Sequence, residues 1–279
     1  MAIKNMPYWK WALLLAASLV LAALLYGLSS VTSLIGLYWL RWVATVAVAC
    51  AMLLLYSLFV KWFEKEPAND LPMRKCAAHT GSGLLVGFCY FVAVVGIMMI
   101  AGCYRIEGFR HDAVGILDAF FMFLIVGIGE EIMFRGVLFR WIDERFGFAA
   151  ALIVSALVFG LVHIANPGAT LWSSIAIAIE AGLLLGAAYK YSGTLWLPIG
   201  IHWAWNFSQG NIFGFDVSGG DAGSTMIIPY IDGPELLTGG DFGAEASIIA
   251  VLLGAALAAF LIIQVRPSSN AEGRKPEEA

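Results

Sequence analysis

Six polar side chains lie in three short blocks within segments that are otherwise apolar. They are Glu130, Glu131 and Arg135 in GEEIMFRG, His163 in FGLVH, and His202 and Asn206 in HWAWN. An ionisable side chain at the centre of a bilayer costs about 2.5–3.5 kcal/mol or more, so such residues usually face a bundle interior or a hydrated cavity and mark function. One buried polar residue is compatible with packing alone. Six of them, with helical spacing inside the blocks, predict an active site.

The first block combines an ion pair with an additional acid. Glu131 and Arg135 are four residues apart and share one helical face, which favours a carboxylate–guanidinium bond. Glu130 points about 100° away around the helix and is free to face a cavity. An ion pair between helices would explain Glu131 and Arg135, but it gives no reason to bury Glu130 beside them. Because burial favours the protonated form of a carboxyl group, Glu130 is a candidate general base.

The second and third blocks each place two side chains on one helical stripe. Phe159 and His163 are four residues apart, and Gly160 between them allows close helix approach. The alternative for His163 is a histidine whose hydrogen bonds are satisfied in the core. His202 and Asn206 are also four apart, so both can donate a hydrogen bond to one point, as an oxyanion-stabilising pair does. The alternative for this pair is hydrogen bonding between helices without chemistry.

Another acid, Glu180 in IAIAIEAGLLLG, has no charged partner in its own segment. We expect it either to line the same cavity or to bond a neighbouring helix.

The composition is that of a membrane protein. Of the 279 residues, 61% are hydrophobic and only 13% are charged, whereas a soluble domain is about a quarter charged. No basic tract indicates nucleic-acid binding. Runs of the length that spans a bilayer fall near 11–28, 42–60, 82–103, 114–134, 149–165, 172–189, 194–211 and 246–265. The sequence thus predicts an all-α polytopic bundle of about eight spans, forming a single integral membrane domain over 1–279.

The distribution of positive charge predicts the orientation of this bundle. With the N-terminus inside, twelve Lys and Arg residues flank the spans on the inner side and only Arg41, Arg105 and Arg110 lie outside. The segment from about 212 to 245 has no Lys or Arg and six acidic residues, which indicates an exterior loop. The positive-inside rule then places both termini in the cytoplasm. The tail 266–279, RPSSNAEGRKPEEA, is predicted to be a disordered cytoplasmic tail.

The ordered set EE-x-x-x-R, F-x-x-x-H and H-x-x-x-N, each in its own hydrophobic segment, resembles the CPBP intramembrane proteases. This family groups the type II CAAX prenyl endopeptidases with bacteriocin-processing and self-immunity (Abi) proteins. The surrounding EEIMFRGVLFRWIDERFG and GTLWLPIGIHWAWN are also similar to the family's usual sequences. The resemblance covers roughly 115–210, which is the motif-bearing core, and Glu180 belongs to none of the motifs.

The resemblance implies an all-helical intramembrane endopeptidase. In such an enzyme Glu130 and His163 would activate a water molecule, and His202 and Asn206 would stabilise the tetrahedral oxyanion. This agrees with the chemistry inferred from the residues, because a base needs a water and the developing negative charge needs preorganised donors.

The same resemblance gives Glu131 and Arg135 the role of organising the site and raises the question of a metal. Glu130, His163 and His202 are a plausible three-ligand zinc set with an open fourth position. However, an H-E-x-x-H pair is absent and Asn is a poor zinc ligand. The sequence therefore favours a glutamate-based mechanism without a cofactor, with zinc as the alternative.

The expected substrate is a membrane-associated peptide or protein within the lipid bilayer. The short loops and compact layout indicate a prokaryotic plasma membrane, where protein prenylation is not expected, so a farnesylated substrate is not carried over. Two alternatives belong to other functional classes. One is a non-catalytic immunity or binding protein of the same family. The other is a small proton-coupled transporter using Glu130, Glu131 and Glu180, although the paired broken helices typical of transporters are not evident.

Overall fold

The computed structural model describes residues 8–265, so the predicted tail 266–279 lies outside the described residues. A helical segment forms at each of the eight apolar runs. The helices before the first motif are α1 (Tyr8–Ser33), α2 (Tyr38–Phe63) and α3 (Met73–Ile100). The motif-bearing helices are α4 (Ala113–Glu131), α5 (Arg140–Phe146), α6 (Phe148–Val162), α7 (Leu171–Ile177), α8 (Leu184–Ser192) and α9 (Trp196–Phe207). The short α10 (Glu235–Thr238) and the apolar α11 (Ile248–Gln264) follow.

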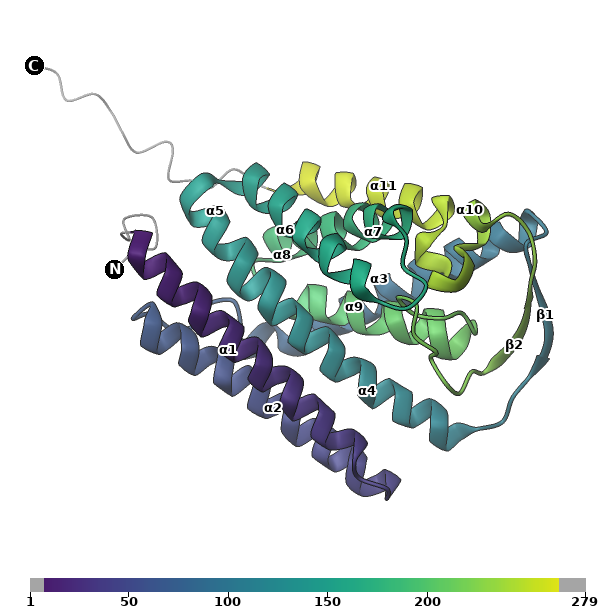
Figure 1. Ribbon diagram of the computed structural model, residues 1–279, viewed down its shortest axis with the longest axis horizontal. Helices are drawn as coiled ribbons and strands as arrows, with labels where there is room; N and C mark the ends of the chain where they lie inside the picture. The colour runs from purple at the N-terminus through teal and green to yellow at the C-terminus, as the bar shows by residue number, and fades with distance from the viewer. Residues whose placement is uncertain (1–7, 266–279) are drawn as a thin grey trace, which may run out of the picture.

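Only part of the eight-span prediction is supported. Six helical segments of the described chain are long and apolar enough to cross a membrane, and α11 is a shorter apolar helix. The run predicted at 194–211 becomes α9, which is shorter still and has ten of its twelve residues buried. Figure 1 shows α9 and α3 in the middle of the bundle, with α1 and α2 along α4 on one side and α11 on the other. Protein, rather than lipid, therefore surrounds α9.

The fold is mostly helical but not all-α, because two strands form where loops were expected. Strand β1 (Tyr104–Phe109) pairs antiparallel with β2 (Ile227–Ile231), and the register is shifted between Ile106 and Gly108. The strands are too short to be recognised from alternation in the sequence. They tie the connection after α3 to the acidic segment 212–245. Both strands lie at the end of the molecule opposite the start of α1 and the end of α11 (Figure 1).

Glycines allow α3 to pack directly on the backbone of α9. A Cβ atom at Gly83 of α3 would lie 2.4 Å from the carbonyl oxygen of Leu197, and one at Gly200 of α9 would lie 2.4 Å from the carbonyl oxygen of Thr80. Small residues permit this approach where apolar helices have no hydrophobic driving force between them. The backbone of α9, the helix that carries His202, is thus in direct contact with α3.

Three helical segments widen into π-helical turns beside polar residues. They are Ile132–Phe139 after Glu131, Ala178–Leu183 around Glu180, and Ser208–Ile212 after Asn206. Such turns often occur at functional sites because they redirect the side chains on either side.

Candidate active site

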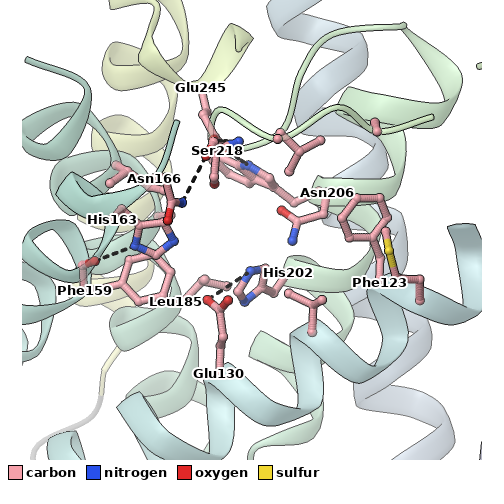
Figure 2. A pocket seen from close by; sticks show the side chains of 18 of the residues that line it. Phe123, Glu130, Phe159, His163, Asn166, Leu185, His202, Asn206, Ser218 and Glu245 are labelled. Carbon is pink, nitrogen blue, oxygen red and sulfur yellow. Dashed lines mark hydrogen bonds and ion pairs between the residues drawn. The ribbon is translucent and has the colours of Figure 1, made fainter. Parts of the chain in front are cut away.

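One cavity of about 270 Å³ is lined by side chains from all three sequence blocks. Glu130 reaches it from the end of α4, and His163 from the point where α6 ends. His202 and Asn206 reach it from α9. Figure 2 shows these four side chains around one shared space. Residues separated by up to 76 positions in the chain are therefore neighbours in the structure.

Glu130 and Glu131 have different environments, as the helical geometry predicts. The Glu130 side chain is 33% exposed and lines the cavity, whereas the Glu131 side chain is fully buried. Oε2 of Glu130 lies 3.8 Å from Nε2 of His202 and accepts no hydrogen bond from the described residues. Glu130 therefore lines the cavity with a carboxylate whose Oε2 faces His202 and has no hydrogen-bond partner among the described residues.

The predicted ion pair between Glu131 and Arg135 is confirmed. Nη1 of Arg135 lies 2.8 Å from Oε1 of Glu131, and both side chains are fully buried. Nη2 of Arg135 lies 3.3 Å from each of the carbonyl oxygens of Ala181 and Gly182, in the π-helical turn between α7 and α8. The pair thus joins two segments that are distant in sequence, and its charges are balanced within the protein interior.

Glu131 also fixes the orientation of His202. Nδ1 of His202 lies 2.8 Å from Oε1 of Glu131. Because a carboxylate oxygen accepts hydrogen bonds, Nδ1 must carry the proton of this bond. The remaining nitrogen, Nε2, is directed toward Glu130. His202 can donate from Nε2 only when its ring is doubly protonated, a state that two neighbouring carboxylates favour electrostatically.

His163 is oriented by the backbone instead of a carboxylate. Its Nδ1 lies 2.6 Å from the carbonyl oxygen of Phe159, which can only accept, so the neutral ring leaves Nε2 as an acceptor. The Phe159 ring is 4.7 Å from the His163 ring and also 4.7 Å from the Arg135 guanidinium. Phe159 therefore contacts both Arg135 of the buried ion pair and His163.

Gly160 makes the close helix approach that its position between Phe159 and His163 predicts. A Cβ atom there would lie 2.3 Å from the carbonyl oxygen of Ser174 and 2.7 Å from the Cβ atom of Ala178. The end of α6 is thus pressed against α7 and the turn that follows it. This contact positions His163 against the cavity.

Asn206 lines the cavity without an internal partner. Its side chain points into the cavity in Figure 2, and the residue is only 6% exposed. None of the described residues forms a hydrogen bond with its side-chain amide. Since buried amides are normally hydrogen-bonded, this group is available to a ligand.

Three residues that the sequence analysis did not select also line the cavity: Glu245, Ser218 and Asn166. Glu245 is 1% exposed and accepts hydrogen bonds from the backbone N–H of Ser218 at 2.6 Å and from its hydroxyl at 2.7 Å. Burial raises the pKa of Glu245, although the Ser218 hydrogen bonds and the nearby His163 oppose the shift. Glu245 lies in a glycine-rich loop and has no helical spacing to any of the three motifs. The sequence therefore carried no indication that Glu245 lines the cavity.

Glu180 does not belong to this cavity. It is fully buried, and its Oε2 accepts a hydrogen bond of 3.0 Å from the Tyr90 hydroxyl on α3. Of the two expectations for Glu180, the structure supports the bond to a neighbouring helix. This placement separates Glu180 from Glu130, which lines the cavity.

The donor groups do not fit the proposed zinc set. Nδ1 of each cavity histidine is bonded, to the Phe159 carbonyl or to Glu131, so Nε2 is the nitrogen that each ring could offer to a metal. Among residues 8–265 no three His, Cys, Asp or Glu side chains are close enough together to hold a metal ion. A three-ligand zinc site requires donor atoms within about 2.0–2.3 Å of one point. Glu130, His163 and His202 thus surround a cavity without forming a coordination site.

Comparison with known proteins identifies the part of the chain that carries the site. Residues 112–208 match the family model described as type II CAAX prenyl endopeptidase Rce1-like. The matched segment runs from the residue before α4 to the turn after α9 and includes all six residues of the three blocks. No curated protein and no solved structure matches the chain.

Proposed function

We propose that the protein is an intramembrane endopeptidase, because residues 112–208 match the Rce1-like type II CAAX prenyl endopeptidase model and the chain is an integral membrane protein. Its substrate is a membrane-associated protein or peptide. The observation that carries the proposal is the convergence of an acid, two imidazoles and an amide from three helical segments on one cavity.

In the proposed reaction Glu130 and His163 activate a water molecule. Both line the cavity with acceptor groups: the carboxylate of Glu130, and Nε2 of the His163 ring in its neutral form. A water that donates one hydrogen to each acceptor directs its lone pair at the substrate carbonyl carbon. Glu130 takes the proton as the water attacks and returns it to the leaving amine. Positioned general bases contribute about 10²–10⁴-fold to rate.

His202 and Asn206 are the proposed donors to the tetrahedral oxyanion. The amide of Asn206 has no internal bond to break, and His202 is held through Nδ1 with Nε2 facing the cavity. Donors fixed in advance stabilise the transition state because they need no reorganisation when charge develops. Glu131 and Arg135 support this arrangement by holding His202 and joining α4 to the turn after α7.

The proposed setting is a prokaryotic plasma membrane with both termini in the cytoplasm. The start of α1 and the end of α11 lie at one end of the bundle, and the acidic segment lies at the other (Figure 1). Since residues 217–222 contribute to the cavity lining, this orientation opens the cavity toward the exterior half of the membrane.

Cleavage of a membrane-anchored reporter peptide by purified protein tests the proposal. We expect wild type to cleave it, and Glu130→Ala, His163→Ala and His202→Ala to lose at least about 10²-fold in kcat. Equal cleavage by wild type and all three variants would eliminate a catalytic role for the cavity. Any cellular phenotype of the gene product that survives Glu130→Gln would instead favour the binding or immunity alternative.

We predict that the reaction does not require a metal. Activity measured before and after dialysis against a strong chelator is expected to be the same, because the cavity side chains do not converge as metal ligands. Loss of activity on chelation, restored by added Zn²⁺, would contradict this prediction.

A further inference from the structure

Among the described residues that line the cavity, the titratable side chains are three carboxylates and the imidazoles of His163 and His202. Its described lining includes Glu130, Asp221 and Glu245 but no Lys or Arg. Two more acids, Asp216 and Asp241, lie in the same loop. Burial raises the pKa of Asp216, and the nearby charges of Asp221 and Asp241 raise it further. The wall and the mouth of the cavity therefore share one sign of charge.

Glu245 is the most constrained of these acids. The Ser218 backbone and hydroxyl saturate Oε1, whereas Oε2 accepts only a long bond of 3.4 Å from Nε1 of Trp205. None of the described Lys or Arg residues forms a salt bridge with it. Burying a carboxylate without a cationic partner is costly, so its position at a cavity requires a reason beyond packing.

Three arginines of the described chain have partners outside the cavity. Arg135 is paired with Glu131, Arg41 with Asp118, and Arg105 lies over the ring of Tyr230. None of these three lines the cavity. The negative potential of the cavity thus remains available to an incoming group.

A separate observation indicates that a ligand enters here. The Asn206 amide is nine-tenths buried, points into the cavity and has no partner among the described residues (Figure 2). An unpartnered donor beside carboxylates that have no Lys or Arg partner fits a peptide that supplies both a carbonyl oxygen and a positive charge.

We propose that the preferred substrates carry a Lys or Arg side chain close to the scissile bond and that Glu245 and Asp221 recognise its charge. Glu245 forms the inner contact and the exposed Asp221 the outer one. This inference rests on the proposed peptidase function and adds a substrate class to it. A bound cation offsets the burial of Glu245, so binding is stronger for a cationic peptide than for its neutral analogue.

Matched peptides in nanodiscs, which expose both faces of the membrane, test the inference. The probes are acyl-anchored fluorogenic peptides of one sequence in which Lys, Gln or Glu is placed at each position in turn. We expect kcat/KM for the Lys peptide to exceed that of the Gln peptide at least about tenfold at one or two positions, with Glu the poorest. In Glu245→Gln the Lys-to-Gln ratio should fall close to one. In Asp221→Asn it should fall partially, and the part due to the exposed Asp221 should weaken in high salt.

The control is Glu235→Gln, an exposed acid of the same loop that does not line the cavity; it should keep the wild-type ratio. The ratio is the readout because a folding defect lowers cleavage of both peptides alike. Equal rates for Lys and Gln peptides in wild type, or an unchanged ratio in both cavity variants, overturn the inference. If wild type cleaves no peptide, the proposed function fails, and the Kd values of the same peptides decide the charge preference separately.

Discussion

At the scale of single residues, the two cavity histidines differ in what holds Nδ1. His163 donates to a backbone carbonyl, and His202 donates to Glu131. The bond to a carbonyl leaves Nε2 of a neutral ring as an acceptor, whereas a carboxylate favours the imidazolium, which can donate. The partner of Nδ1 therefore distinguishes the two imidazoles in our proposal: His163 acts as a base, and His202 acts as an oxyanion donor.

Asn206→Ala is predicted to separate catalysis from stability. We expect kcat to fall by about 10²–10³-fold, with a nearly unchanged melting temperature, since the wild-type amide makes no bond within the described structure. Asn166→Ala is the matched control, because its amide donates to the Ser218 carbonyl oxygen at 3.0 Å. This control should lose about 1 kcal/mol of stability. A large drop in melting temperature for Asn206→Ala would indicate a structural role for that residue.

Arg135→Ala is predicted to destabilise the protein strongly. It leaves the fully buried Glu131 without its cation, and breaking a buried pair in this way costs about 3–5 kcal/mol. The double variant Glu131→Gln/Arg135→Met removes both charges and should recover much of the stability but not the activity, because His202 loses the carboxylate that holds it. Thermal unfolding and peptide cleavage measured on both variants test this. Full activity in the double variant would show that the pair has no positioning role.

At the scale of elements, close helix contacts set the position of each block. Gly160→Ala places a methyl group against the Ser174 backbone, where a Cβ atom would be 2.3 Å from the carbonyl oxygen. We expect α6 to shift, His163 to move from the cavity, and both activity and melting temperature to fall. Gly96→Ala in α3 is the control, because a Cβ atom there meets nothing within 4 Å and alanine favours the helix. Equal behaviour of the two variants would contradict this account of α6.

The connection between α2 and α3 is anchored by Asp70, which predicts a pH dependence. Its Oδ2 accepts hydrogen bonds from the Tyr56 hydroxyl at 2.6 Å and the Tyr189 hydroxyl at 3.1 Å. Burial raises the pKa of Asp70 above its ordinary value of 3.8, although the hydrogen bond from Tyr56 opposes this. The Asp70 carboxyl group therefore binds its proton more tightly in the folded state than in the unfolded state. The contribution of the protonated Asp70 to the free energy of unfolding declines as pH rises from 3.8 to the raised pKa.

Asp70→Asn is expected to remove that decline. The melting temperature of the variant should rise relative to wild type as pH increases across this interval, and the difference should then stay constant. Thermal unfolding in detergent at a series of pH values measures it. A difference independent of pH would show that Asp70 ionises alike in both states.

At the scale of the whole molecule, the positively charged side chains differ between the two ends of the bundle. The connection after α2, in or beside which Lys61, Lys65, Arg74 and Lys75 lie, and the segment 212–245, which has no Lys or Arg, lie at opposite ends of the bundle (Figure 1). In a background without native cysteines, Glu66→Cys and Glu235→Cys, both at exposed positions, are predicted to react with an impermeant maleimide from opposite faces. Only the second should be labelled in intact cells. Labelling of both would contradict the proposed orientation.

The sequence alone determined the membrane class, the order of the helical segments and the six residues of the three blocks. These features depend on composition and on spacing within one helix, where 3.6 residues per turn makes neighbours predictable. The pair Glu131–Arg135 and the cavity-facing position of Glu130 follow from that geometry.

Only the tertiary structure decided which distant side chains meet. Glu131 bonds His202 across 71 positions, Ser218 holds Glu245, and β1 pairs with β2. Glu180 and Glu245 are both isolated acids in the sequence, yet one bonds Tyr90 and the other lines the cavity. Contacts between helices depend on which glycine faces which backbone, and no local periodicity encodes that choice.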